Sequence, residues 1–352
     1  MKESTLHLLR DPVTGHKFDH VKIDISDEIN GVAHIVSGKT IFGNNVYDIS
    51  NCILKFSSHE NQNVYNRMWS DGIKKISLGT ENRGVDLKER LLTRLGCKSL
   101  GWLEGRSFLD VGCGLGRFSY AAADMGANVI GIDSSSYSLK EVFDWTANSL
   151  TPEKFSHCDF IQTDIMDRIF IDGVFDVVFC AHVIHHLKDT RDGLRHISNY
   201  VRDRGHLAVT FYDGINYKFP PLTYFLREMF LELPEDLRFR ALRKLGIWEV
   251  GNEDIVIDVP AAMKKCMEDD DLEEVFTALG LKHALYHENT STPFMWVQTP
   301  DEVEDWIADL GYSIEFNRGC TVVGRRGSPT LREKLRLYIR RKLFSKPYGL
   351  HY

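Results

Sequence analysis

The sequence has few cysteines, and their spacing disfavours two common ways of stabilising a small domain. The 352 residues include seven cysteines, an odd number, and no two of them form a Cys-x-x-Cys pair. A disulfide framework and a thiolate zinc site are therefore disfavoured, and we expect a cytoplasmic protein in a reducing environment. The cysteines are Cys52, Cys97, Cys113, Cys158, Cys180, Cys266 and Cys320.

Long apolar runs and an excess of positive charge are also missing. The segment Met1–Arg10 lacks the apolar core of a signal peptide. No window approaches the roughly 18 apolar residues of a membrane-spanning helix. The chain has 43 Lys and Arg against 50 Asp and Glu, a net charge of -7, which argues against a dedicated nucleic-acid binder. With 43% hydrophobic and 26% charged residues, the composition is that of a folded globular protein.

Strand and helix signals alternate through the middle of the chain, a pattern that predicts right-handed βαβ units and an α/β fold with a parallel sheet. Expected strands are Ser107–Val111, Asn128–Ile132, Phe160–Thr163, Val174–Cys180 and Gly205–Tyr212. Expected helices are Arg117–Met125, Ser138–Asn148 and Thr190–Val201. The alternation resumes with a helix at Pro300–Leu310 and strands at Ser313–Phe316 and Cys320–Arg325.

The same patterns predict six segments. They are a small β module at 1–57, a helical lead-in at 58–100, a nucleotide-binding core at 101–212, a helical insertion or lid at 213–292, the end of the core at 293–328 and a basic tail at 329–352. Short strands are expected in the first segment at Val21–Ile25, Val32–Val36 and Thr40–Phe42, with Gly38 as a turn signal. Helices are expected in the insertion at Leu222–Leu233 and Glu235–Leu245.

The strongest signal is a glycine-rich turn between an apolar strand and a helix. Gly112, Gly114 and Gly116 have G-x-G-x-G spacing, whereas dinucleotide-binding turns usually read G-x-G-x-x-G. Asp110 lies just before the turn, where its carboxylate would repel a pyrophosphate and attract the ammonium of an amino acid. This arrangement favours the methionine part of S-adenosylmethionine over NAD, so a nicotinamide dehydrogenase is the weaker alternative.

Two further carboxylates follow the next two expected strands. Asp133 ends the second strand, a position suited to the hydroxyls of a ribose. Asp164 follows the third strand and could accept a hydrogen bond from the amino group of adenine.

Together these elements resemble the class I S-adenosylmethionine-dependent methyltransferases, particularly the branch that acts on small molecules. Their first motif is matched by Asp110–Gly116 and their fourth-strand motif by Phe175–Leu187, and the resemblance covers about 101–212. It implies a Rossmann-like, mostly parallel seven-stranded sheet with helices on both faces and S-adenosylmethionine as the cofactor. The implied cofactor residues are Asp110, Gly112, Cys113, Gly114, Gly116, Asp133, Ser134, Asp164, Ile165 and Ala181.

Three histidines, His182, His185 and His186, follow the fourth strand, where open α/β sheets bind their ligands. A hydroxyl that accepts a methyl group must lose its proton, and a histidine can remove it. His186 or His185 is the candidate base; packing against the cofactor or capping the next helix is the alternative for all three. The Asn/Asp-Pro-Pro-aromatic motif of many nitrogen methyltransferases is missing, and no acidic cluster resembles a metal site. We therefore expect methylation of a small molecule, at oxygen rather than carbon or nitrogen, without a metal.

The remaining segments suggest accessory roles. Leu9–Gly15 and Gly43–Ile49 resemble a zinc-ribbon-like domain in which Asp11 and Thr14 stand at two cysteine positions, so the metal would be lost; an unrelated β module is the alternative. In related enzymes a helix like that carrying Tyr65, Asn66 and Trp69 closes over the cofactor, although ordinary amphipathic packing is favoured here.

The tail at Leu331–Lys346 is a basic amphipathic segment. It could contact an anionic membrane peripherally, but docking on the chain's own acidic domain is favoured. The alternatives to a small-molecule methyltransferase are an enzyme acting on a lipid-linked or macromolecular substrate, and a non-catalytic S-adenosylmethionine-binding protein.

Overall fold

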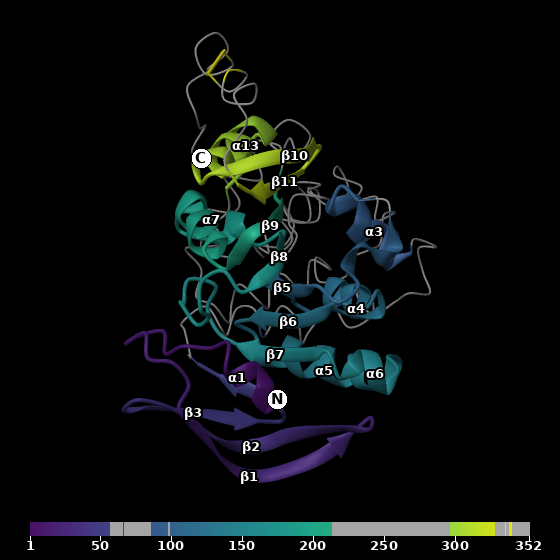
Figure 1. The fold of residues 1–352 in the computed structure, drawn as a ribbon, viewed down its shortest axis with the longest axis vertical. Coiled ribbons are helices and arrows are strands. Elements are labelled where there is room, and N and C mark those ends of the chain that lie inside the picture. The colour runs from purple at the N-terminus through teal and green to yellow at the C-terminus, as the bar shows by residue number, and fades with distance from the viewer. Residues whose placement is uncertain are drawn as a thin grey trace, which may run out of the picture.

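One mixed β-sheet extends along the molecule (Figure 1). The computed structural model describes residues 1–56, 66, 86–97, 99–212, 296–327, 335, 338 and 339. Within these residues the sheet has 11 strands in the order β1-β2-β3-β4-β7-β6-β5-β8-β9-β11-β10. No helix in these ranges is long and apolar enough to cross a membrane.

The centre of the sheet is parallel, as the alternating pattern predicts. It consists of β7 (Cys158–Gln162), β6 (Asn128–Asp133), β5 (Ser107–Val111), β8 (Phe175–Ala181) and β9 (Val201–Thr210). β11 (Thr321–Arg326) lies antiparallel between β9 and β10 (Tyr312–Arg318). These seven strands confirm the predicted Rossmann-like sheet.

The order of the central strands reverses at β5. The chain runs outward from β5 through β6 to β7 and then returns to β8 on the other side of β5. Val111 pairs with Cys180, so β5 and β8 end side by side. Ligands of open α/β sheets bind where the strand order reverses in this way.

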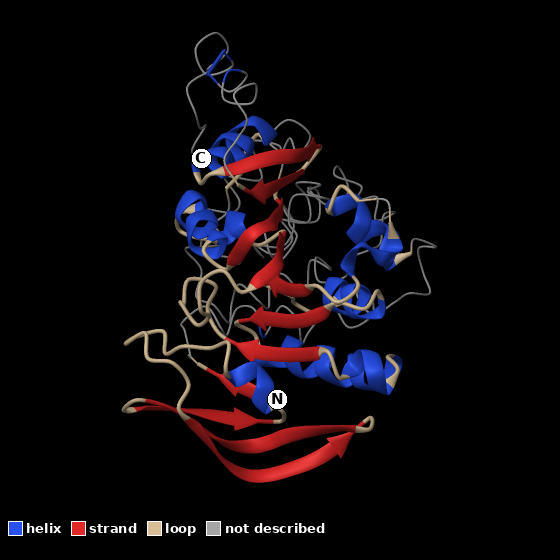
Figure 2. Cartoon of the chain, in the orientation of Figure 1, coloured by secondary structure: helices blue, strands red, loops and turns tan. Residues whose placement is uncertain are grey.

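Helices cover both faces of the sheet, because neighbouring strand residues point to opposite sides (Figure 2). On β5, Phe108 belongs to the apolar cluster that contains residues of α3, α4 and α5, and Leu109 to the cluster beneath α7 and α13. The helices are α1 (Glu3–Leu6), α3 (Leu87–Arg94), α4 (Arg117–Asp124), α5 (Ser136–Ser149), α6 (Pro152–Phe155), α7 (Thr190–Ser198) and α13 (Pro300–Asp309), with the short 3₁₀ turns η2 (Leu100–Leu103) and η3 (Ile184–His186).

The N-terminal strands continue the same sheet. β1 (His20–Ile29), β2 (Val32–Phe42), β3 (Asn45–Ser50) and β4 (Ile53–Lys55) are antiparallel to one another, and β4 pairs in parallel with β7. The prediction of separate strands at Val32–Val36 and Thr40–Phe42 is wrong, because Gly38 lies inside β2. A Cβ at Gly38 would lie 2.5 Å from the carbonyl oxygen of Lys22, so this glycine permits close approach of β1 near its bulge.

Hydrogen bonds stabilise the turn at Asp11 in the segment that resembles a zinc-ribbon-like domain. Asp11 Oδ1 accepts from the backbone N–H groups of Val13 and Thr14 at 2.7 and 3.0 Å. Asp11 Oδ2 accepts from Asn45 Nδ2 at 2.5 Å, which joins the two matched stretches. The carboxylate thus stabilises the turn through N–H groups.

Several predicted boundaries move. The helix expected at Thr190–Val201 ends at Ser198, and Val201 begins β9, four residues before the predicted start. The cause is a bulge: Val201 pairs with Phe175, and regular pairing resumes only at His206 opposite Val177. In the lead-in, the structure describes Asn66 and α3 but not Tyr65 or Trp69. The predicted helices Leu222–Leu233 and Glu235–Leu245 lie outside the described residues.

Candidate functional site

The glycine turn packs closely against the residues that follow β8 and against α5. Gly112 and Gly116 have φ angles of 69° and 75°, in the left-handed region that side chains disfavour. A Cβ at Gly112 would lie 2.4 Å from Val183, which follows β8. A Cβ at Gly116 would lie 1.8 Å from Val142 of α5. Both glycines are therefore required by the backbone angle and by the space available.

Asp133 holds the glycine turn from the adjacent strand. Its Oδ2 accepts from the N–H of Gly114 at 2.9 Å, and its Oδ1 accepts from the N–H of Ser135 at 2.8 Å. Burial raises the pKa of the carboxyl group above its ordinary value. Each carboxylate oxygen can accept more than one hydrogen bond. The carboxylate that the sequence assigns to the ribose is thus fixed between the glycine turn and the start of α5.

Asn66 contacts the start of α5 although it is distant in sequence. Its Oδ1 accepts from Ser135 Oγ at 2.8 Å and from the N–H of Tyr137 at 3.2 Å. It thus contacts the first turn of α5, immediately after the predicted cofactor residue Ser134. This contact was not predicted for Asn66.

Asp110 is buried beneath the turn. The residue is 3% exposed, and its Oδ2 accepts from Ser119 Oγ of α4 at 2.6 Å. Burial raises the pKa of its carboxyl group to about 7. Cys113 is also within the turn, where its N–H donates to Ile132 at 2.9 Å and burial raises the pKa of its thiol well above the ordinary value.

The adenine-side residues follow β7, next to Asp133. The N–H of Thr163 donates to the carbonyl oxygen of Asp133 at 3.0 Å, which brings the two predicted subsites together. Asp164 is half-buried, and its Oδ1 accepts from the N–H of Met166 at 2.8 Å. Ile165, the other residue assigned to this side, is half-buried as well. The side chain of Gln162 donates to the carbonyl oxygen of Ser134 at 3.0 Å.

His182 is the first of the three histidines that follow β8. It follows Ala181, the last residue of β8, and its backbone is left-handed, with a φ of 59°. Its Nε2 lies 3.1 Å from Nη2 of Arg94. A guanidinium can only donate, so Nε2 accepts and the ring proton is on Nδ1. Burial, with the nearby charges of Arg94 and Arg117, lowers the pKa of His182 to about 3, so the ring is neutral near neutral pH.

His185 and His186 lie in the short turn η3. His185 is 0% exposed and stacks on the ring of Tyr212 with 3.9 Å between centroids. Burial lowers the pKa of His185 well below its ordinary value. Neither ring nitrogen of His185 has a hydrogen-bond partner within the described residues. The ring of His186 is 4.3 Å from that of His185.

Trp296 ties the chain after the insertion to this turn. Its backbone N–H donates to the carbonyl oxygen of His185, and its indole Nε1 donates to that of Leu187, both at 2.8 Å. Trp296, Tyr212 and Arg94 were not predicted as site residues. A single aromatic residue or an arginine at a helix end carries no motif, so only the tertiary structure reveals these contacts.

Comparison with known proteins supports the assignment of this region. Residues 109–209 match the methyltransferase domain family. The chain is 31% identical over 145 residues to phosphoethanolamine N-methyltransferase 2 of Caenorhabditis elegans, covering 41% of this chain and 30% of that protein. It is 29% identical over 142 residues to the mitochondrial ubiquinone biosynthesis O-methyltransferase of Schizosaccharomyces pombe, covering 40% of this chain and 48% of that protein.

Solved structures include similar chains. Magnesium protoporphyrin IX methyltransferase from Synechocystis PCC 6803 with bound SAM is 13% identical, with a TM-score of 0.41 and coverage of 77% of this chain and 93% of that chain. The chain spans less than half the length of the curated relatives named above. The matched domain coincides with the glycine turn, the two strand-end carboxylates and the histidine segment.

Proposed function

We propose that the chain, whose residues 109–209 match the methyltransferase domain family, transfers a methyl group from S-adenosylmethionine to an oxygen atom of a small molecule. The glycine turn and the carboxylates near it fit this methyl donor. Left-handed glycines let the backbone approach a ligand closely, and carboxylates stand at the predicted ribose and adenine positions. When bound, S-adenosylmethionine supplies an electrophilic methyl group.

The contact between Arg94 and His182 favours an oxygen atom over an amine nitrogen as the methyl acceptor. Arg94 donates to His182 at 3.1 Å, and burial, with the nearby charges of Arg94 and Arg117, lowers the pKa of that histidine. Both guanidinium groups thus place positive charge near this histidine. This charge would repel a cationic amine, and it would stabilise a hydroxyl oxygen that gains negative charge as it loses its proton.

The three histidines then take different roles. His182 cannot easily remove a proton, because Arg94 occupies its Nε2 and the pKa is about 3. Its Nδ1–H can instead donate to the acceptor oxygen. His185 packs against Tyr212 and shapes the turn. His186 remains the candidate base that removes the hydroxyl proton, while Trp296 covers the turn and helps exclude water.

A methyl-transfer assay tests this proposal. The full chain is incubated with S-adenosylmethionine and with either 3,4-dihydroxybenzoate or phosphoethanolamine, and S-adenosylhomocysteine and the methylated product are measured by mass spectrometry. We expect a methyl ether from the phenol. Methylation of the amine instead would contradict the oxygen assignment, and cofactor binding without turnover on either probe would favour a binding protein.

Two variants test the base. His186→Gln should reduce kcat at least about 100-fold, the usual contribution of a general base. His20→Gln is the matched control, because His20 is exposed on the edge strand β1. An unchanged rate for His186→Gln would remove His186 from the mechanism.

A lipid-linked substrate is a second candidate, favoured by the tail. Leu335, Tyr338 and Ile339 are 56%, 60% and 42% exposed. Exposed apolar residues within a basic segment suit an anionic membrane surface. Sedimentation of the full chain with phosphatidylglycerol vesicles, but not with phosphatidylcholine vesicles, would support this candidate. The double variant Leu335→Glu/Ile339→Glu should then stay in solution, and equal sedimentation of both proteins would refute the role of the tail.

A further inference from the structure

The loop after β7 is closed by the carboxylate of Asp167. Its Oδ2 accepts from Thr163 Oγ1 at 3.1 Å and from the backbone N–H of Asp164 at 3.3 Å. In return, the N–H of Asp167 donates to the carbonyl oxygen of Asp164 at 3.1 Å. The backbone of Asp164 is therefore bonded to Asp167 through both its N–H and its carbonyl group.

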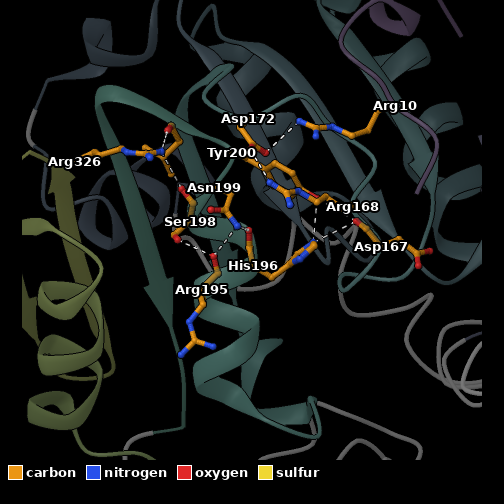
Figure 3. A network of polar contacts seen from close by, with 11 residues as sticks. Arg10, Asp167, Arg168, Asp172, Arg195, His196, Ser198, Asn199, Tyr200 and Arg326 are labelled. Carbon is orange, nitrogen blue, oxygen red and sulfur yellow. Dashed lines mark hydrogen bonds and ion pairs between the residues drawn. The ribbon is translucent and has the colours of Figure 1, made fainter. Parts of the chain in front are cut away.

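The backbone of Asp167 is in turn held by side chains from α7 and the turn after it (Figure 3). The hydroxyl of Tyr200 donates to the carbonyl oxygen of Asp167 at 3.0 Å, and His196 Nε2 lies 3.3 Å from the same oxygen. Tyr200 and His196 also contact each other at 3.0 Å. Tyr200 is 1% exposed and packs edge-on against Phe170, so this support is anchored in the core.

The two ends of the loop are fixed as well. At its start, the N–H of Thr163 donates to the carbonyl oxygen of Asp133 at 3.0 Å. At its end, the N–H of Arg10 donates to the carbonyl oxygen of Ile169 at 2.7 Å. A loop bonded at both ends and in the middle presents its side chains in one direction.

The direction of the Asp164 side chain is the outcome of these bonds. Its Oδ1 accepts from the N–H of Met166 at 2.8 Å, whereas Oδ2 accepts from none of the described residues. A hydrogen bond to a ligand requires alignment, so a shift of the Asp164 backbone would weaken it. The orientation of the Asp164 side chain therefore depends on Asp167.

We propose that Asp167 is a positioning residue that, with Tyr200 and His196, directs Asp164 at the exocyclic amino group of adenine and so makes the site selective for adenine over hypoxanthine. This inference rests on the proposed function for the identity of the cofactor. It adds a network that contacts no ligand and that reaches the site through the backbone of one loop.

Comparing two ligands in several variants tests the proposal. Calorimetry on the full chain gives the Kd of S-adenosylhomocysteine and of S-inosylhomocysteine, in which an oxygen replaces the amino group. We expect the wild type to prefer the adenine ligand by about 10- to 100-fold, the effect of one hydrogen bond to a charged group. In Asp167→Ala the preference should fall to within about 3-fold of unity, mainly through weaker binding of the adenine ligand.

Further variants separate positioning from a general loss of structure. Asp167→Asn should keep the preference, because a single oxygen of Asp167 accepts both loop bonds and an amide oxygen can replace it. Tyr200→Phe should reduce it by removing one bond to the loop. Asp172→Ala is the matched control: Asp172 pairs with Arg10 and Arg168 in the neighbouring network (Figure 3) and forms no hydrogen bond with Asp164.

Each other outcome overturns the inference in a distinguishable way. An unchanged preference in both Asp167→Ala and Tyr200→Phe would show that the network does not aim Asp164. An equal loss for both ligands would make Asp167 a structural residue only. A wild type without preference would show that Asp164 does not read the amino group, while leaving methyl transfer intact. If the wild type bound neither ligand, the proposed function would fail together with this inference.

Discussion

The buried carboxylate of Asp110 should make the ligand-free protein less stable as the pH rises. Asp110 is 3% exposed, and burial raises the pKa of its carboxyl group from 3.8 to about 7. Between these two values the folded protein keeps a proton that the unfolded chain has lost. The free energy of unfolding therefore falls with increasing pH in this interval. Its contribution is most favourable below about pH 4 and is lost by about pH 7.

The size of this effect follows from the two pKa values of Asp110. The difference of about 3 pH units, at about 1.36 kcal/mol for each unit, corresponds to about 4 kcal/mol of stability lost between pH 4 and pH 8. The substitution Asp110→Asn keeps the shape and an oxygen that accepts from Ser119, and it never ionises. The variant should thus match the wild type near pH 4 and exceed its stability by up to about 4 kcal/mol at pH 8.

Urea unfolding of the ligand-free chain at pH 5, 6, 7 and 8 measures the difference. Asp48→Asn is the control, because Asp48 is exposed on β3 and its profile should parallel the wild type. Parallel profiles for wild type and Asp110→Asn would refute the raised pKa.

Binding of the cofactor product should depend on pH in the opposite direction. If Asp110 attracts the ammonium of the methionine part, as the sequence predicts, S-adenosylhomocysteine favours the ionised carboxylate. Its affinity for the wild type should then rise with pH up to about 7 and should not do so for Asp110→Asn. A flat profile for the wild type would leave Asp110 as the partner of Ser119 rather than of the ligand.

Three further substitutions test the site and its frame. Asp133→Ala should weaken binding of S-adenosylhomocysteine by about 1–3 kcal/mol in calorimetry, because both Gly114 and the ribose lose a hydrogen-bond acceptor. Unchanged binding would contradict the ribose assignment. Gly116→Ala should destabilise the fold by at least about 1–2 kcal/mol in urea, since its φ is 75° and the new Cβ would meet Val142; a loss below that range would mean that α5 shifts freely. Thr299→Ala should cost about 1 kcal/mol in the same assay, because the side chain of Thr299 caps α13 by accepting from the N–H of Glu302; equal stability would show that this cap contributes nothing.

The placement of the candidate cofactor residues in the fold could be predicted because its determinants are local. The glycine turn, the strand before it and the helix after it are contiguous, and the nearly continuous burial of β5 follows from the coverage of both faces of the sheet. Asp133 and Asp164 were assigned from their places after strands, and parallel strands bring such places to one edge of the sheet. The capping box at Thr299 and Glu302 is likewise readable within four residues and is present in the structure.

The N-terminal strands show what local patterns do not specify. Nothing in Ile53–Lys55 indicates that β4 will pair with β7, since only two residue pairs join these strands. Gly38 was taken for a turn because glycine occurs both in turns and where two backbones approach closely. Which of these applies depends on the register with β1, and that register is a property of the paired strands.

The histidines show that the type of a residue locates a candidate site more reliably than it predicts the chemical role of that residue. An isolated histidine titrates near neutrality, which makes it a reasonable base. In the folded chain the guanidinium of Arg94, 88 residues earlier, donates to His182, and burial lowers its pKa to about 3. The same side chain thereby becomes a neutral donor with its proton fixed on Nδ1. The proposed role of His182 therefore depends on an arginine that belongs to no motif.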